Sequence, residues 1–231
     1  MPEAGARAKP PRWTAVPRIL VRLALLSIPF FAAGNLRWTR GWIWIGLAAF
    51  SVAVVLGVAR VKNPALVRTR LNSKAPSMAF DKVFALLYTL SAAAFLVVCG
   101  LDARWGWSQL PVKWLYAGVA LHLAALVLLV AVAAANPFLE STVRIQSERG
   151  HVAVSSGPYA MVRHPMYLAL IVMYPAWALV LGSLWALIPA VCVALLFVFR
   201  TIHEDRALRR ELPGYEDYAR RTRYRLIPGL W

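Results

Sequence analysis

Six long apolar runs interrupt the charged residues of this 231-residue chain, and they constrain its fold more than any other feature. The runs cover residues 17–33, 42–60, 83–101, 112–135, 165–181 and 184–200. A helix that crosses a bilayer needs about 20 apolar residues, and fewer when flanking side chains reach back to the membrane surface. The runs therefore predict an all-α, polytopic integral membrane helical bundle of about six transmembrane helices.

The composition excludes a water-soluble domain. Hydrophobic residues make up 60% of the chain and charged residues 16%, whereas soluble domains have roughly 45–50% and about 25%. Cys99 and Cys192 both lie in apolar runs, so neither a disulfide framework nor a cysteine metal site is indicated. The net charge of +16 falls between the apolar runs and not on one continuous face, so nucleic acid is not expected as a partner.

The positive charge is distributed unevenly between the two sides of the predicted bundle. With alternating crossings, segments 1–22, 60–82, 136–164 and 200–231 lie on one side and carry +13 of the +16. The more basic side of a membrane protein is the cytoplasmic one. Tryptophans gather at the opposite side, as in an interfacial belt: Trp38, Trp42, Trp44, Trp105, Trp107 and Trp114. We expect a multi-pass protein of a bacterial-type inner (plasma) membrane, with both termini and the active site in the cytoplasm.

No repeat at a fixed period and no linker divides the chain, which predicts one membrane domain overall. Within it, residues 1–135 would supply the N-terminal transmembrane helices. Residues 136–231 would form a C-terminal region with a polar loop, a tight helical hairpin through Gly182 and Ser183, and cytoplasmic C-terminal helices. Function is expected in segments 136–164 and 200–231, the two polar segments of sufficient length.

The first candidate site lies where a polar loop enters an apolar run. Gly157-Pro158 is a turn signal, and Pro165 suits the first position of a helix. Arg163 and His164 would then lie beside the positive end of a helix dipole, where a carboxylate or phosphate binds favourably. The alternative is an interfacial Arg-His pair that contacts lipid headgroups.

The second candidate site lies where the last apolar run meets water. Arg200 and Glu204 are four residues apart and would share one helix face. A solvated ion pair is the alternative, but charges at the inner membrane boundary favour a polar ligand. His203 and Glu204 do not form a metal-binding spacing, so no metal is expected. His122, alone in an apolar run, is predicted to pack or to hydrogen-bond between helices.

The basic tail allows two interpretations. It can lie on anionic lipid, or it can contact a substrate or cofactor. Its residues of interest are Tyr215, Tyr218, Arg220, Arg221, Arg223 and Arg225.

A series of short motifs runs through the C-terminal part of the chain. They are Gly157-Pro158-Tyr159, then Val162-Arg163-His164-Pro165-Met166-Tyr167, then Glu204-Asp205, Leu208, Gly214-Tyr215, Tyr218 and Ile227-Pro228. In this order and spacing, the chain resembles the isoprenylcysteine carboxyl methyltransferase family and its broader relatives, the membrane phospholipid methyltransferases. The resemblance covers about residues 136–228 and makes 136–231 the expected catalytic region, with a donor-binding loop.

The resemblance implies S-adenosyl-L-methionine as the cofactor and methyl donor. The residues that it assigns to donor binding are Gln146, His151, Val152, Ala153, Val154, Gly157, Tyr159, Arg163, His164, Pro165, Met166, Tyr167 and Glu204. Arg200 matches the position that contacts the substrate carboxylate, so Arg200 and Glu204 are the expected catalytic residues. The expected partners are the lipid bilayer and a prenylated or lipid-like acceptor.

The chemistry of methyl transfer fits a site at a membrane boundary. An anionic nucleophile and a cationic sulfonium neutralise each other in this displacement, so a site of low dielectric favours it. The protein must mainly align the reactants and limit water. These considerations favour carboxyl O-methylation of the kind carried out on isoprenylcysteine.

Three alternatives remain open from the sequence. A phospholipid amine acceptor would need a base to remove its proton. A small-molecule acceptor, such as a thiol or a quinone-type compound, is the second. A membrane transporter is the non-enzymatic alternative, but the charges collect at one boundary and do not pair across the midplane.

Overall fold

The computed structural model describes residues 16–64, 79–139 and 145–231, which are helical and contain no strand. The α-helices are α1 (Val16–Ala33), α2 (Thr39–Lys62), α4 (Ala79–Trp105), α5 (Val112–Ala135), α6 (Pro165–Leu181), α7 (Leu187–Glu211) and α8 (Tyr215–Arg221). Two 3-10 turns, η2 (Ser147–Arg149) and η3 (Gly157–Ala160), lie in the loop between α5 and α6. The predicted all-α membrane bundle is confirmed.

The predicted count of six transmembrane helices is wrong. Among the described residues, four helices have the length and hydropathy to cross a membrane, namely α2, α4, α5 and α7. The other two predicted runs form shorter apolar helices, Ala24–Ala33 within α1 and the 17-residue α6. Seventeen residues rise only about 26 Å, less than the roughly 30 Å of a bilayer core.

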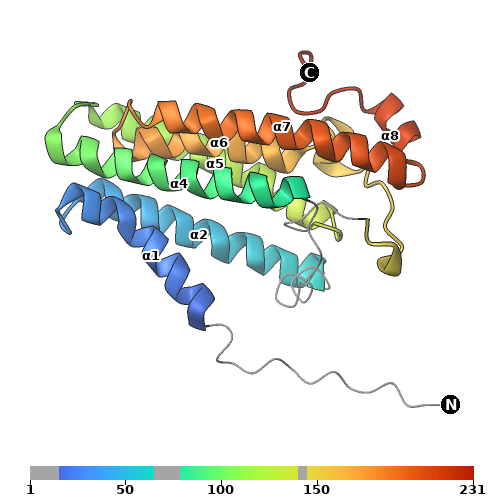
Figure 1. Ribbon diagram of the computed structural model, residues 1–231, viewed down its shortest axis with the longest axis horizontal. Coiled ribbons are helices and arrows are strands. Elements are labelled where there is room, and N and C mark those ends of the chain that lie inside the picture. Colours follow the sequence, from blue (N-terminus) through green and yellow to red (C-terminus); the bar gives the residue numbers. More distant parts are fainter. Residues whose placement is uncertain (1–15, 65–78, 140–144) are drawn as a thin grey trace.

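The helices pack as a bundle with α1 and α2 at one side and α5, α6 and α7 at the other (Figure 1). Helix α4 packs on both α1 and α7, and α5 packs along α6. Gly118 allows the approach of α5 to α6, because a Cβ there would lie 2.8 Å from the carbonyl oxygen of Ala176 and from the amide of Val180. Helix α6 therefore lies within the bundle although it is short.

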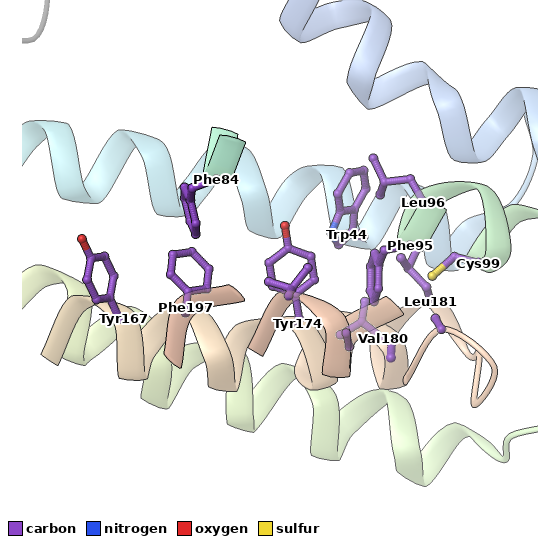
Figure 2. Packing of buried hydrophobic residues seen from close by; sticks show 14 of the residues in the cluster. Trp44, Phe84, Phe95, Leu96, Cys99, Tyr167, Tyr174, Val180, Leu181 and Phe197 are labelled. Carbon is purple, nitrogen blue, oxygen red and sulfur yellow. The ribbon is translucent and has the colours of Figure 1, made fainter. Parts of the chain in front are cut away.

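Aromatic rings link the middle of the bundle to the end that the charge pattern predicts to be cytoplasmic (Figure 2). The ring of Phe197 on α7 lies 5.6 Å from that of Phe84 on α4 and 5.3 Å from that of Tyr167 on α6. Farther along α6, Tyr174 packs edge-on against Phe95 of α4. These contacts fix three helices relative to one another next to the first turn of α6.

Hydrogen bonds close the opposite end of the bundle. The buried Asp102 carboxylate accepts hydrogen bonds from Ser108 at 2.6 and 2.7 Å and from Ser183 at 2.6 Å. The α6–α7 hairpin turns at Gly182, whose φ of +83° suits glycine. The predicted hairpin is confirmed.

His122 joins three helices. Its Nε2 lies 2.9 Å from Ser51 Oγ, and Trp177 Nε1 donates to its Nδ1 at 3.0 Å. The prediction of an interhelical hydrogen-bonding histidine is confirmed.

Candidate functional site

The start of α6 is paired with a segment near the end of the chain. Helix α6 begins at Pro165, as predicted, and His164 precedes it. The main-chain amides of Arg163 and His164 donate to the carbonyl oxygens of Tyr224 and Arg225, both at 2.9 Å. The segment around Tyr224 therefore holds the entry to α6 in place.

A single buried carboxylate, that of Asp205 on α7, joins four segments. Arg163 approaches it through Nε at 2.7 Å and Nη2 at 3.2 Å. Tyr215 donates to it at 3.0 Å, Arg225 at 3.2 Å and Arg209 at 3.3 Å. A buried charge needs partners of this kind to offset its desolvation. We therefore assign to Asp205 the role of holding the site together.

Arg163 and His164 differ in how their side chains are used. Arg163 also donates through Nη1 to the carbonyl oxygens of Thr222 at 2.8 Å and Arg223 at 2.9 Å. Its guanidinium thus connects the start of α6 to α7 and to residues 222–223. His164 Nε2 is buried, lies 3.6 Å from Asp205 Oδ1, and makes no hydrogen bond among the described residues. Buried polar atoms without such a partner are uncommon and call for an explanation.

A pocket of about 790 Å³, part of which is open to solvent, lies between helix α6, helix α7 and the loop that joins α5 to α6. The structure brings twelve of the residues predicted from sequence to its wall: Gln146, His151, Val152, Ala153, Val154, Tyr159, Arg163, His164, Met166, Tyr167, Arg200 and Glu204. Gly157 and Pro165 do not line it: Gly157 begins the turn η3, and Pro165 begins helix α6.

Seven further residues line the pocket. They are Asn136, Phe138, Leu139, Leu208, Leu212, Tyr215 and Tyr218. The spacing of Leu208, four residues after Glu204 on α7, could have placed it on the same face. Asn136, at the end of α5, donates to the hydroxyl of Tyr159 at 2.8 Å. Nothing in the sequence near Asn136 indicates this contact, which joins separate segments.

Arg200 is buried at the inner end of the pocket, where it contacts α4 and α6. Its Nε donates to the hydroxyl of Tyr167 at 2.8 Å, and that hydroxyl donates to Glu204 Oε2. The direct Arg200–Glu204 distance is 3.9 Å, so Tyr167 bridges the predicted ion pair. Arg200 Nη2 lies 3.3 Å from Asp81 Oδ1, and the guanidinium lies over the Phe84 ring at 4.4 Å.

The loop before η3 is folded on itself. Gln146 donates to the carbonyl oxygen of Phe138 at 2.6 Å and accepts a hydrogen bond from Arg149. The ring of His151 packs on that of Phe138, with centroids 4.6 Å apart. Gln146, only 1% exposed, thus shapes the loop that presents residues 151–154 to the pocket.

Three tyrosines outside the membrane helices keep their protons at neutral pH. Burial is the main cause that raises the pKa of Tyr159, Tyr215 and Tyr218, in the last case to about 12. Tyr218 uses its hydroxyl to donate to the carbonyl oxygen of Tyr159 at 2.8 Å. Tyr215 and Tyr218 therefore act as hydrogen-bond donors, the Tyr159 hydroxyl accepts from Asn136, and none of the three acts as a base.

Comparison with known proteins agrees with the motifs. Residues 116–210 match the model of the isoprenylcysteine carboxyl methyltransferase (ICMT) family, so the resemblance is confirmed over that segment. A similar curated protein is the nickel-cobalt-cadmium resistance protein NccN of Alcaligenes xylosoxydans xylosoxydans, 35% identical over 79 residues. That match covers 34% of this chain and 37% of the curated protein.

Proposed function

From the match of residues 116–210 to the isoprenylcysteine carboxyl methyltransferase family, we propose that the chain is an S-adenosyl-L-methionine-dependent integral membrane methyltransferase. We propose a carboxylate of a prenylated or lipid-like molecule as the acceptor, as in protein-S-isoprenylcysteine carboxyl O-methylation. The observation that carries the proposal is the convergence of Arg200, Tyr167 and Glu204 at one pocket where α6 begins.

The pocket fits the proposed donor in charge and polarity. Glu204 uses Oε2 to accept from Tyr167, while among the described residues its Oε1 accepts no hydrogen bond. That oxygen would bind the ammonium of the donor as a charge-assisted pair. The buried Nε2 of His164, 3.6 Å from Asp205 Oδ1, would also contact the polar part of the donor. Val152, Val154 and other apolar side chains would cover the rest.

The residues of the chain would orient the acceptor and limit water. When bound, S-adenosyl-L-methionine supplies an electrophilic methyl group on a sulfonium. Arg200 would hold the acceptor carboxylate through its planar guanidinium. The Tyr167 hydroxyl, which bonds both Arg200 and Glu204, fixes the position of that guanidinium. A carboxylate nucleophile needs no general base. Alignment and exclusion of water would then provide most of the rate enhancement.

A lipid amine is the second candidate acceptor, and Asp81 favours it. This buried carboxylate already lies 3.3 Å from Arg200 Nη2, so two carboxylates, Asp81 and Glu204, lie near one guanidinium. Asp81 would compete with an acceptor carboxylate for Arg200, and Glu204, which lines the pocket, would accept the proton of an ammonium. Direct comparison of a prenylated cysteine with a phospholipid amine as acceptor separates the two.

We further propose that the pocket opens to the cytoplasm of a bacterial-type inner membrane. Segments 136–164 and 200–231 supply most of its wall, meet where Arg163 binds Asp205, and together carry a net charge of +4, as the cytoplasmic side of a membrane protein does. We also propose the division into N-terminal helices, 1–135, and a catalytic region, 136–231.

Donor binding and methyl transfer by purified protein in lipid nanodiscs test the proposal. Calorimetry should detect S-adenosyl-L-methionine binding to the parent protein, weakened about tenfold or more in Glu204→Gln and in His164→Ala, because each loses a polar contact of roughly 1.5–3 kcal/mol. Glu211→Gln, at the exposed end of α7, is the matched control. No binding by the parent would refute the function, and unchanged binding in both variants would refute the site.

A further inference from the structure

A second, basic pocket lies beside the arginines that surround Asp205. Five arginines line it: Arg163, Arg209, Arg220, Arg223 and Arg225. Ala219, Tyr224, Leu230 and Trp231 complete the wall, with the Arg225 guanidinium over the Trp231 ring at 5.1 Å. Within the described part of the chain, no acidic residue lines this pocket. It is distinct from the proposed donor pocket and shares only Arg163 with it.

Positive charge remains in this pocket after its ion pairs are counted. Asp205 lies beneath it and pairs with Arg163, Arg209 and Arg225. At the rim, Glu216 pairs with Arg209 at 2.6 Å, and Arg220 reaches acidic side chains only at 4.0 Å. Among the described residues, Arg223 has no acidic partner within 4.0 Å. Guanidinium groups in such number favour phosphate, which they bind bidentately.

The length of α7 would place the pocket near the headgroup layer of a bilayer. Helix α7 starts at Leu187 at the opposite end of the bundle, and Arg209 follows 22 residues later. That separation is roughly 33 Å along the helix, slightly more than the roughly 30 Å bilayer core. Arg209 would therefore reach the lipid phosphates if α7 crosses the membrane. Figure 1 shows the C-terminal segment beside this end of α7.

Exposed apolar side chains accompany the arginines. Leu230 is 76% exposed, Ile227 46% and Tyr224 38%, all within the segment that supplies Arg223 and Arg225. Apolar side chains next to basic ones are typical of surfaces that lie in a membrane interface.

We propose that the basic pocket binds the phosphate of an anionic phospholipid, with Arg220 and Arg223 contacting the phosphate and Leu230 in the acyl region. Because Asp205 joins Arg225 and Arg209 to Arg163, the bound lipid would also brace the wall of the donor pocket. Binding of phospholipid at this pocket does not depend on methyl transfer.

Native mass spectrometry of the full chain, released from nanodiscs of phosphatidylglycerol and phosphatidylcholine, tests the proposal. The parent should retain one phosphatidylglycerol in preference to phosphatidylcholine. Each arginine near anionic lipid contributes about fivefold in affinity, so Arg220→Gln/Arg223→Gln should weaken retention about 25-fold. The control is Arg206→Gln/Arg221→Gln, which removes the same two charges at exposed arginines that do not line the pocket. It should retain the lipid as the parent does.

Three outcomes would overturn the proposal. The first is equal retention of phosphatidylglycerol by the parent and the double variant. The second is an equal loss in the Arg206→Gln/Arg221→Gln control, which would indicate attraction by net charge alone. The third is retention of inorganic phosphate at the pocket without retention of lipid, which would make this a site for a soluble anion.

Discussion

The carboxylate of Asp205 decides more about the site than any other single residue. It is fully buried and holds Arg163, Arg209, Arg225 and Tyr215 around one point. Its neighbour in sequence, Glu204, faces the pocket instead. Two adjacent acids on one helix thus have different tasks, because their side chains point in different directions around α7.

Replacing Asp205 by Asn should destabilise the protein severely. Arg163 would keep a buried positive charge without its partner, and breaking a buried pair costs about 3–5 kcal/mol. Chemical unfolding in detergent micelles should show a decrease of this size in the free energy of unfolding. Asp217→Asn, an exposed acid on α8, should change stability by no more than about 0.5 kcal/mol. Equal stability of the two variants would contradict the assigned role.

Removing the Tyr167 hydroxyl should impair the reaction more than it impairs folding. Tyr167→Phe leaves both Arg200 Nε and Glu204 Oε2 without the bridge. Loss of a hydrogen bond to charged groups is worth about 1.5–3 kcal/mol, which corresponds to a drop in kcat/KM of roughly 10- to 150-fold.

Tyr174→Phe is the matched control for this prediction. Tyr174 also lies buried on α6, and its hydroxyl lies 3.1 Å from that of Tyr88, away from the pocket. The kcat/KM of Tyr174→Phe should stay near that of the parent. A similar loss in both variants would show that the bridge through Tyr167 has no special part in the reaction.

Arg200→Ala separates the acceptor role of Arg200 from its part in donor binding. Turnover should fall more than donor affinity, because the guanidinium would hold the acceptor carboxylate. Arg200→Lys is the second variant. It keeps a positive charge near Asp81, so it tests the acceptor role without leaving that carboxylate unpaired. Methyl transfer and calorimetric donor binding are measured side by side. If both quantities fall equally in Arg200→Ala, the acceptor role is refuted.

At the scale of elements, the sequence predicted the ends of helices better than the contacts between them. Pro165 and Gly182 marked the start and end of α6, because their effects on the backbone are local. The pairing of Asp81 with Arg200 joins residues more than a hundred positions apart, which no local pattern records. The pocket residues between 146 and 167, together with Arg200 and Glu204, were found because short motifs carried the resemblance to a known family. Asn136, which carries no such motif, was missed.

The contact between α5 and α6 should fail when Gly118 is enlarged. In Gly118→Leu, the new side chain would meet the α6 backbone at 2.8 Å, so the helices would have to separate. Overpacking of this kind typically costs about 1–3 kcal/mol, and thermal unfolding in detergent should show it. Gly46→Leu on α2 is the control, because a Cβ at this position would have no atom within 4 Å. Equal unfolding temperatures would contradict the predicted clash.

At the scale of the whole molecule, polar networks close both ends of the bundle. Asp102 organises one end, and Asp205 organises the other. Residues 1–15 and 65–78, which carry much of the positive charge behind the predicted orientation, lie outside the described residues. The placement of the termini and the pocket on the cytoplasmic side therefore stays a prediction.

Labelling of single cysteines in intact bacterial cells tests that orientation. In a Cys99→Ala/Cys192→Ala background, Lys113→Cys should react with a membrane-impermeant maleimide from outside. Arg221→Cys should react only after the membrane is opened, because it lies at the predicted inner end. Both positions are exposed in the fold. The reverse labelling pattern would overturn the orientation.

The pairing of Arg163 and His164 with residues 224 and 225 has a consequence for biosynthesis. Arg163 also needs the carbonyl oxygens of Thr222 and Arg223 to place its guanidinium. These acceptors leave the ribosome about sixty residues after Arg163 itself. A growing chain can insert its long helices and still have no finished site. The protein would therefore become competent to bind its ligand only after nearly all of the described sequence has been translated.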